Sequence, residues 1–247
     1  MYAHRSTFLV LALVLLLALL VLSGARPYDR ATWVMEVFPI VIAVPVLLST
    51  YRRFPLTTLL YVCLFLHALV LMLGGAYTYA RVPLGFQIAD YLDLARNPYD
   101  KIGHFFQGFV PALVAREILV RGAYVLGRKM LVFNVICIVL AISACYEFLE
   151  WGAALLMGQG ADEFLGTQGD PWDTQSDMFF ALIGAVCALF LLSGEQDRQI
   201  RRLMNAALRD RDPDVSASTD HKHRSAETVG KLASGEQRRR LETRNDP

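Results

Sequence analysis

Cysteine is scarce and unpatterned in this sequence, and charge is nearly absent from long stretches of it. The four cysteines, Cys63, Cys137, Cys145 and Cys187, show neither a CxxC pair nor the spacing of zinc ligands. We therefore expect no structural disulfide and no zinc site. The sequence also has no nucleic-acid-binding motif. These shortages argue against a disulfide scaffold, a zinc module and a nucleic-acid-binding protein.

Apolar residues are abundant instead. They make up 55% of the 247 residues, with a mean hydropathy of +0.38, whereas soluble domains usually contain ~45–50%. They lie in long runs, and nearly uncharged runs of about 20 residues are typical of transmembrane helices. The sequence therefore predicts an all-α polytopic transmembrane helical bundle of about six spans. The predicted spans are Phe8–Leu22, Trp33–Thr50, Leu56–Ala76, Lys101–Val120, Met130–Met157 and Asp173–Leu192.

The two ends of the chain carry further predictions. Residues 1–25 form either an uncleaved first span, which the long apolar run favours, or a cleaved signal peptide that ends at Ser23-Gly24-Ala25. Residues 1–193 are predicted to be the transmembrane domain. Residues 194–247 are predicted to be a cytoplasmic tail that begins with an amphipathic helix and is disordered from Asp210 on. Between spans three and four, Phe86–Ala95 is predicted to be a short surface helix.

The distribution of basic residues predicts the orientation. With six spans, one side of the membrane receives most of the arginines and lysines of short loops, which marks the cytoplasmic side. These residues are Arg5, Arg52, Arg53, Arg121, Arg128 and Lys129. Both termini are therefore predicted to be cytoplasmic. Trp33, Trp151 and Trp172 then fall at the outer boundary, as an aromatic belt would.

Polar residues near the outer ends of four spans are predicted to gather in one pocket. Glu147 and Glu150 are spaced i, i+3, and Asp173 and Asp177 are spaced i, i+4, so each pair shares a helix face. The candidate catalytic residues are Asp100, His104, Glu147, Glu150, Asp173 and Asp177, and the candidate substrate-binding residues are Lys101, Gln107 and Gln175. Glu36 lies at the same depth. Charged groups within spans should face the bundle or a wet cavity.

Carboxylates this close together repel unless something compensates their charge. Lys101, His104, a shared proton or a bound divalent cation could each do so, and oxygen-rich ligands favour Mg²⁺ or Ca²⁺. Simpler roles also exist: Asp100 and Asp173 could cap helices. We interpret His67 as a residue that hydrogen-bonds between helices, and Arg116 and Glu117 as inner-interface residues without a specific role.

Three segments resemble YjdF-type bacterial inner-membrane proteins, a family that is a domain of unknown function. They are Asn97 to Gly108 (NPYDKIGHFFQG), Tyr146 to Trp151 (YEFLEW) and Gly166 to Met178 (GTQGDPWDTQSDM). The resemblance covers roughly Trp33–Leu192 and implies a location in the bacterial inner membrane.

A fainter likeness is to VanZ-like membrane proteins. Their Asp-Lys-x-x-His-Phe pattern is matched by Asp100 to Phe105, and Glu147 matches the acidic residue of a second pattern. Glu150 stands where that second pattern has Gln. Asp177 and Gly184 match a third pattern, in which Ala181 stands where the family has Asn.

Three functions fit these observations. The first is a membrane enzyme that acts on a lipid or polyprenyl headgroup at the outer leaflet, with the acids as general acid/base groups or metal ligands. The second is a proton- or cation-coupled transporter with a relay through Glu36, His67, His104 and Glu147. The third is a non-catalytic partner of a protein that the sequence does not identify. The inner halves of the spans hold few ionisable residues, which argues against the relay.

Overall fold

The structure, a computed structural model, describes residues 2–157 and 168–211, with side chains for residues 5–156 and 168–208. In this part of the chain there are seven α-helices and one 3₁₀ turn. They are α1 (Tyr2–Ala25), α2 (Arg30–Thr50), α3 (Thr58–Tyr77), η1 (Tyr79–Arg81), α4 (Pro83–Leu92), α5 (Tyr99–Arg121), α6 (Arg128–Met157) and α8 (Asp173–Arg211). The sequence between the fifth and sixth predicted spans, from Gly158 to Trp172, predicts a loop rich in glycine and acidic residues. Most of this loop, residues 158–167, lies outside the described residues, and so does the predicted disordered tail beyond residue 211.

The prediction of a polytopic helical membrane protein is confirmed. Among the described residues, five helices are long and apolar enough to cross a membrane: α1, α2, α3, α6 and α8. Helix α5, the predicted fourth span, has 23 residues, enough for a crossing of about 30 Å. Helix α5 is not among these five because the charged residues near both of its ends lower its mean hydropathy.

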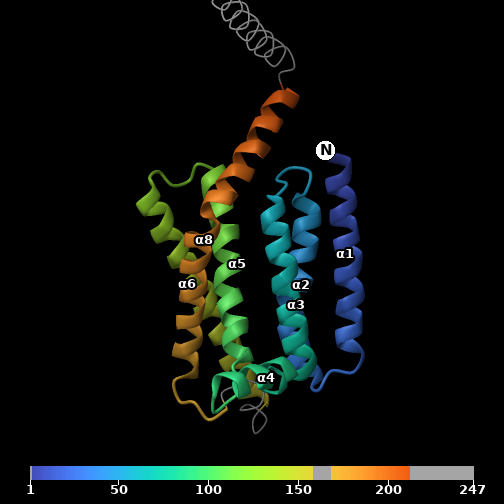
Figure 1. Cartoon of the computed structure of the whole chain (residues 1–247), viewed down its shortest axis with the longest axis vertical. Helices are drawn as coiled ribbons and strands as arrows, with labels where there is room; N and C mark the ends of the chain where they lie inside the picture. The colour runs from blue at the N-terminus through green and yellow to red at the C-terminus, as the bar shows by residue number, and fades with distance from the viewer. Residues whose placement is uncertain (1, 158–167, 212–247) are drawn as a thin grey trace, which may run out of the picture. The chain divides into compact units, whose positions relative to one another are not determined.

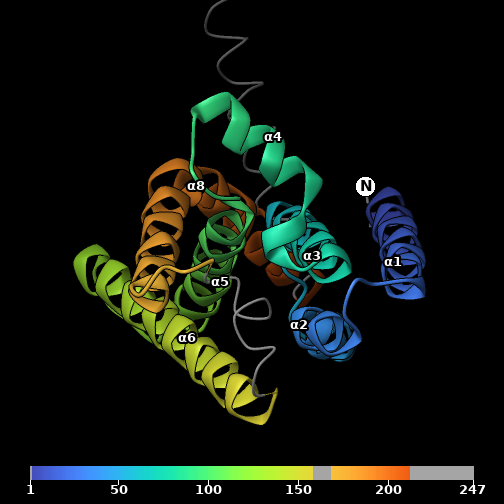
Figure 2. The ribbon, with the colours of Figure 1, turned by 90° about the horizontal axis from the view of Figure 1, so that it is seen from below.

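The chain divides into two units after Ile200, and the packing described below belongs to the first. The helices run alternately up and down, and α5 lies among α3, α6 and α8 (Figures 1 and 2). We call the end where α2, α5 and α8 begin the α4 end, since α4 lies there (Figure 1). The other end, with the α2–α3 and α5–α6 loops, is the opposite end. Helix α8 continues without a break past the predicted limit at Leu192.

Two clusters of buried apolar side chains fill the bundle. One joins α3, α5, α6 and α8 through residues such as Leu60, Leu113 and Val139, and the other joins α1, α2 and α3 through Leu16 and Ile40. Outward-facing side chains are also large and apolar, especially along α1 and α2. Because lipid is as apolar as these side chains, close packing rather than the hydrophobic effect holds the helices together.

Helices α5 and α8 cross so closely that the contact has room only for glycine at two positions, Gly108 and Gly184. A Cβ atom added to Gly108 would overlap the carbonyl oxygen of Ala181, and one added to Gly184 would overlap the carbonyl oxygen of Phe105. Both obstacles are backbone atoms, so neither could move aside cheaply. The two glycines therefore set the distance between the helices that carry most of the candidate site.

The α4 end is closed by η1, α4 and the segment that leads into α5. Helix α4 is the predicted surface helix, shifted a few residues toward the N-terminus, and it ends at Asp93 in the left-handed conformation. Asn97 ties the segment together: its Nδ2 donates to the carbonyls of Ala80 and Val82 at 3.2 and 3.0 Å, and its Oδ1 accepts from the backbone N–H of Tyr99. These contacts fix where α5 begins.

Candidate functional site

The candidate residues come together at the α4 end, where four helices each supply one or more of them. Helix α2 supplies Glu36, and the start of α5 supplies one acid, Asp100, together with Lys101 and His104. The last turns of α6 supply Glu147 and Glu150, and the start of α8 supplies Asp173 and Asp177. Most of these side chains are buried: Glu36, Asp100, His104, Glu147, Asp173 and Asp177 are between 2% and 7% exposed. We call this group, together with Lys101 and Glu150, the acidic cluster.

Lys101 joins α5 to α8 within the acidic cluster. Its Nζ lies 2.7 Å from Oδ1 of Asp173 and 2.6 Å from Oδ1 of Asp177, with Oδ2 of Asp100 at 3.5 Å. The spacing of Asp173 and Asp177 lets both reach one ammonium group from the same face of α8. A buried ammonium with three carboxylates around it has its charge compensated locally. Lys101 therefore holds the two aspartates in place.

His104 lies between carboxylates from three helices. Its Nε2 is 3.4 Å from Oδ1 of Asp100 and 3.7 Å from Oδ2 of Asp177, and its Nδ1 is 3.9 Å from Oε1 of Glu147. Nδ1 is also 3.0 Å from Oε1 of Gln107, one turn further along α5. Contacts at both ring nitrogens therefore fix the orientation of the imidazole. Oε1 of Glu147 is buried and has no hydrogen-bond partner among the described residues.

Two groups of three residues in the cluster could hold a metal ion, and they share His104. One is Asp100, His104 and Asp177, and the other is His104, Glu147 and Glu150; in each group the donor atoms lie within 4.8 Å of one another. Carboxylate oxygens suit Mg²⁺, Ca²⁺ and Mn²⁺, and the imidazole nitrogen extends the range toward Zn²⁺. This donor set would suit a divalent cation, which is one of the four means of charge compensation that the sequence leaves open.

Two tyrosines extend the cluster toward α2. The hydroxyl of Tyr146 donates to Oε2 of Glu36 at 3.2 Å. The ring of Tyr79, in η1, fits against Gly74 and Gly103, where an added Cβ would overlap it. Burial raises the pKa of the Tyr79 hydroxyl well above its usual range, and the nearby Glu36 carboxylate adds to the shift. Tyr79 is therefore a neutral hydroxyl beside a buried acid.

The rim of the cluster is closed by Arg96. Its Nη2 lies 2.6 Å from Oδ2 of Asp170, and its Nη1 lies 3.5 Å from Oδ1 of Asp173. The backbone N–H of Trp172, and then Arg96, lower the pKa of the Asp170 carboxyl below its usual value. Gln168 adds a second link, because its side chain exchanges two hydrogen bonds with the backbone of Asn97. The segment before α8 is thereby tied to the segment before α5.

The predicted site residues thus meet with few exceptions. Gln107 reaches the cluster through His104, whereas Gln175 is exposed on α8 and stays a prediction. Sequence reasoning missed the participation of Tyr79, Tyr146 and Arg96. Tyr146 stands next to Glu147 and could have been found by its position, but Tyr79 and Arg96 lie in a long connection and only packing brings them near.

A second buried polar network lies at the opposite end, where we expected no specific role for Arg116 and Glu117. Glu117 is fully buried and accepts hydrogen bonds from the backbone N–H and the hydroxyl of Thr57 at 2.9 and 2.7 Å. Arg121 is 3.0 Å from the same carboxylate. Arg116 donates to Gln196 and lies 2.7 Å from Asp197. The expectation was wrong: these residues connect the α2–α3 loop, α5 and α8.

The interpretation of His67 as a helix–helix hydrogen-bonding residue is also not borne out for its Nε2. That atom is buried, and the described part of the chain offers it no hydrogen-bond partner. The ring is stacked on Phe106 of α5, with centroids 6.3 Å apart and planes inclined by 25°. The physical reason is position, because His67 faces apolar side chains of α2 rather than polar groups.

Fold and site together define a multi-pass α-helical membrane protein with a buried acidic and histidine cluster at one end of its bundle. The chain belongs to the family described as "Predicted membrane protein (DUF2238)", whose model matches residues 8–198. It is similar to the inner membrane protein YjdF of Escherichia coli (strain K12), with 63% identity over 184 residues, which are 74% of this chain and 88% of that protein. No solved structure matches the chain.

These comparisons confirm the resemblance to YjdF-type proteins and the assignment to the bacterial inner membrane. The likeness to VanZ-like proteins stays a prediction. The family description states a membrane location and no activity.

Proposed function

We propose that the acidic cluster is the reaction centre of a membrane enzyme that acts on the phosphate-bearing headgroup of a lipid or polyprenyl carrier at the outer leaflet. The observation that carries the proposal is the position of His104 as the shared member of two possible metal-binding groups. Acids that serve only to connect helices would not need to converge on one imidazole. The cluster also lies at an end of the bundle, and the ends of spanning helices are where headgroups would be reached.

A bound cation would let a phosphate group approach the cluster in this mechanism. Six carboxylates, those of Glu36, Asp100, Glu147, Glu150, Asp173 and Asp177, outnumber the ammonium of Lys101 and the imidazole of His104. Such a surplus repels a phosphate group. A divalent cation held by Asp100, His104 and Asp177 would reverse that repulsion and polarise a phosphoryl oxygen.

The side chains then divide into distinct roles. Glu147 is the best-placed proton acceptor, since its Oε1 is buried beside His104 and has no hydrogen-bond partner within the described residues. Lys101 was expected to bind substrate, but its ammonium is engaged by Asp173 and Asp177. We assign it as a positioning residue for the two aspartates. Gln107 positions His104 in the same way.

Metal binding and activity of the purified protein test the proposal. Wild type, Asp177→Asn and Glu147→Gln would be compared for bound Mg²⁺, Mn²⁺, Ca²⁺ and Zn²⁺, for thermal shift with each ion, and for phosphate release from lipid phosphates. We expect an ion to bind and stabilise wild type, Asp177→Asn to lose binding, and Glu147→Gln to lose activity. Glu117→Gln is the matched control, because it neutralises a buried acid at the opposite end.

Either of two results would contradict the proposed enzymatic function. Retained activity in both variants would exclude the cluster as a reaction centre. Metal binding without activity on any lipid phosphate would leave a metal site in a non-catalytic protein.

Coupled transport is a second candidate, favoured by one observation. The buried network around Glu117 gives the opposite end the ionisable groups that the sequence had suggested were missing there. Proteoliposomes distinguish the two functions: a transporter produces a proton or cation flux that Glu117→Gln and Asp177→Asn both abolish, whereas the enzyme produces none.

A further inference from the structure

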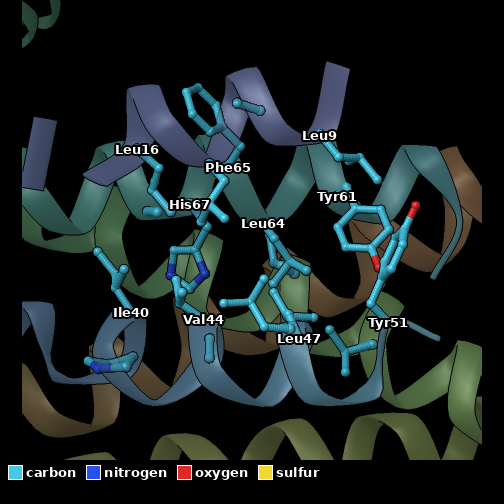
Figure 3. A pocket seen from close by; sticks show the side chains of 18 of the residues that line it. Leu9, Leu16, Ile40, Val44, Leu47, Tyr51, Tyr61, Leu64, Phe65 and His67 are labelled. Atoms are coloured by element: carbon cyan, nitrogen blue, oxygen red, sulfur yellow. The ribbon is translucent and has the colours of Figure 1, made fainter. Parts of the chain in front are cut away.

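A cavity separate from the acidic cluster lies among the membrane-spanning helices. Helices α1, α2, α3 and α5 line a partly open cavity of about 390 Å³, which is within the size range of small-molecule sites. Figure 3 shows Tyr51 and Tyr61 at one end of the cavity and Leu16, Ile40 and His67 at the other. None of the residues of the acidic cluster lines it.

The lining is apolar almost throughout. Leucine, valine, isoleucine and phenylalanine side chains form most of the wall, and Pro39 and Pro111 contribute from α2 and α5. Such a wall suits a hydrophobic molecule that enters from the lipid phase. Water is a poor occupant, since a stable buried water needs two to four polar partners.

His67 is one of the few polar residues in this wall, with Ser6, Tyr51 and Tyr61. Figure 3 shows its ring extending from α3 toward Ile40 and Val44 of α2. Phe106 covers the ring from α5, and Nε2 finds no hydrogen-bond partner in the parts of the chain that the structure describes. A buried polar atom without a hydrogen-bond partner destabilises the fold. The ring lines the cavity, and because Nε2 itself has almost no accessible surface, a partner from outside the chain would reach it after a small rotation of the ring.

The depth of His67 restricts what that partner can be. His67 is the tenth residue of the 20-residue helix α3, so it lies near the middle of a span of about 30 Å. The ester groups and phosphates of phospholipids stay near the interface, and acyl chains carry no hydrogen-bonding atom. A partner for Nε2 must therefore be a neutral, membrane-soluble molecule that brings an oxygen atom to mid-depth.

We propose that this cavity binds an isoprenoid quinone, with a ring oxygen hydrogen-bonded to Nε2 of His67. A quinone carbonyl accepts from Nε2–H, and a quinol hydroxyl donates to the other tautomer, so either form satisfies the imidazole. Aromatic side chains in contact with the site, Phe65 and Phe106, offer faces against which a flat ring can pack. The proposal concerns binding alone and does not depend on the acidic cluster.

Binding of decylubiquinone to the purified full-length chain tests the proposal. The measured quantities are the dissociation constant by isothermal titration and the shift of the melting temperature. Squalene, an isoprenoid without oxygen, and phosphatidylglycerol serve as comparison ligands. We expect decylubiquinone to bind and stabilise wild type and the comparison ligands to have little effect.

Three variants separate the hydrogen bond from the cavity. His67→Phe keeps a ring and removes the nitrogen, and we expect the dissociation constant to rise about tenfold, the loss of one hydrogen bond. His67→Gln keeps a hydrogen-bonding group and should restore part of the affinity. Ala43→Phe narrows the cavity from α2 and should block binding while His67 is intact. Because His67→Phe removes an unpartnered polar atom, it should fold at least as well as wild type.

The alternatives give different results. If squalene or phosphatidylglycerol binds as tightly as the quinone, the cavity takes a hydrocarbon chain and the proposal is overturned. The same holds if His67→Phe binds the quinone as well as wild type does, or if decylubiquinone does not bind at all.

Discussion

The ammonium of Lys101 lies 2.6 Å from the carboxylate of Asp177, and this buried ion pair joins α5 to α8. Asp173, one helical turn earlier on α8, shares the same ammonium at 2.7 Å. The pair therefore has two consequences: it fixes the position of an acid that we assign to metal binding, and its loss would leave two buried carboxylates without their cation.

Lys101→Met is expected to destabilise the protein strongly. Breaking a buried ion pair by removing one partner typically costs 3–5 kcal/mol, because a buried charge remains uncompensated. The melting temperature in detergent checks this, and Lys101→Met combined with Asp177→Asn should recover part of the loss. Arg198→Gln is the control, since its pair with Glu195 is largely exposed and surface pairs contribute little. A melting temperature for Lys101→Met equal to that of the control would contradict the assignment.

Gly108→Ala tests the close crossing of α5 and α8. The new methyl group would meet the backbone oxygen of Ala181, so the helices must separate, at a cost of about 1–3 kcal/mol or more. Gly194→Ala is the matched control on α8, because its added methyl group meets nothing and alanine favours helix by about 0.5–1 kcal/mol. We expect a lower melting temperature for the first and an equal or higher one for the second. Equal stability of the two variants would contradict the close backbone contact between α5 and α8.

Thr57→Val tests the network at the opposite end. The hydroxyl of Thr57 donates to Glu117 at 2.7 Å and accepts from the backbone N–H of Leu60, where it caps α3. Losing a cap costs about 0.5–2 kcal/mol, and the buried carboxylate loses a donor as well. Thr50→Val is the control, because within the described part of the chain that exposed hydroxyl hydrogen-bonds only to carbonyls of its own helix.

The Thr57→Val variant should melt earlier while its metal binding stays at the wild-type level, as the network and the acidic cluster lie at opposite ends of the bundle. A loss of metal binding would mean that the two ends are coupled and would favour the transport function.

Hydropathy and topology predicted much of this arrangement from the sequence. Runs of about 20 apolar residues located the spans, and the alternation of spans brought Asp100, His104, Glu147 and Asp177 to the same end. That inference needs only the number of crossings between residues, which is why it survived shifts of several residues at helix ends.

The contacts that depend on detailed packing were not predictable. Tyr79 reaches the cluster because Gly74 and Gly103 leave room for its ring. No local sequence pattern predicts this contact. Arg116 and Glu117 resembled ordinary interface charges, since their partners Thr57 and Gln196 are distant in sequence. His67 was a single histidine in an apolar span, which is typical of a residue that hydrogen-bonds between helices. The cavity beside it could be found only from the structure.

Orientation in the membrane provides the last prediction. The bias of arginine and lysine predicts that the opposite end faces the cytoplasm, so the acidic cluster faces the periplasm. Asp90, in α4, and Arg53, in the α2–α3 loop, are both exposed, at the two ends of the bundle. In a cysteine-free background, Asp90→Cys should react with a membrane-impermeant maleimide in cells whose outer membrane has been permeabilised. Arg53→Cys should react only after the inner membrane is disrupted. The reverse labelling would place the cluster in the cytoplasm, and the substrate would then be a headgroup of the inner leaflet.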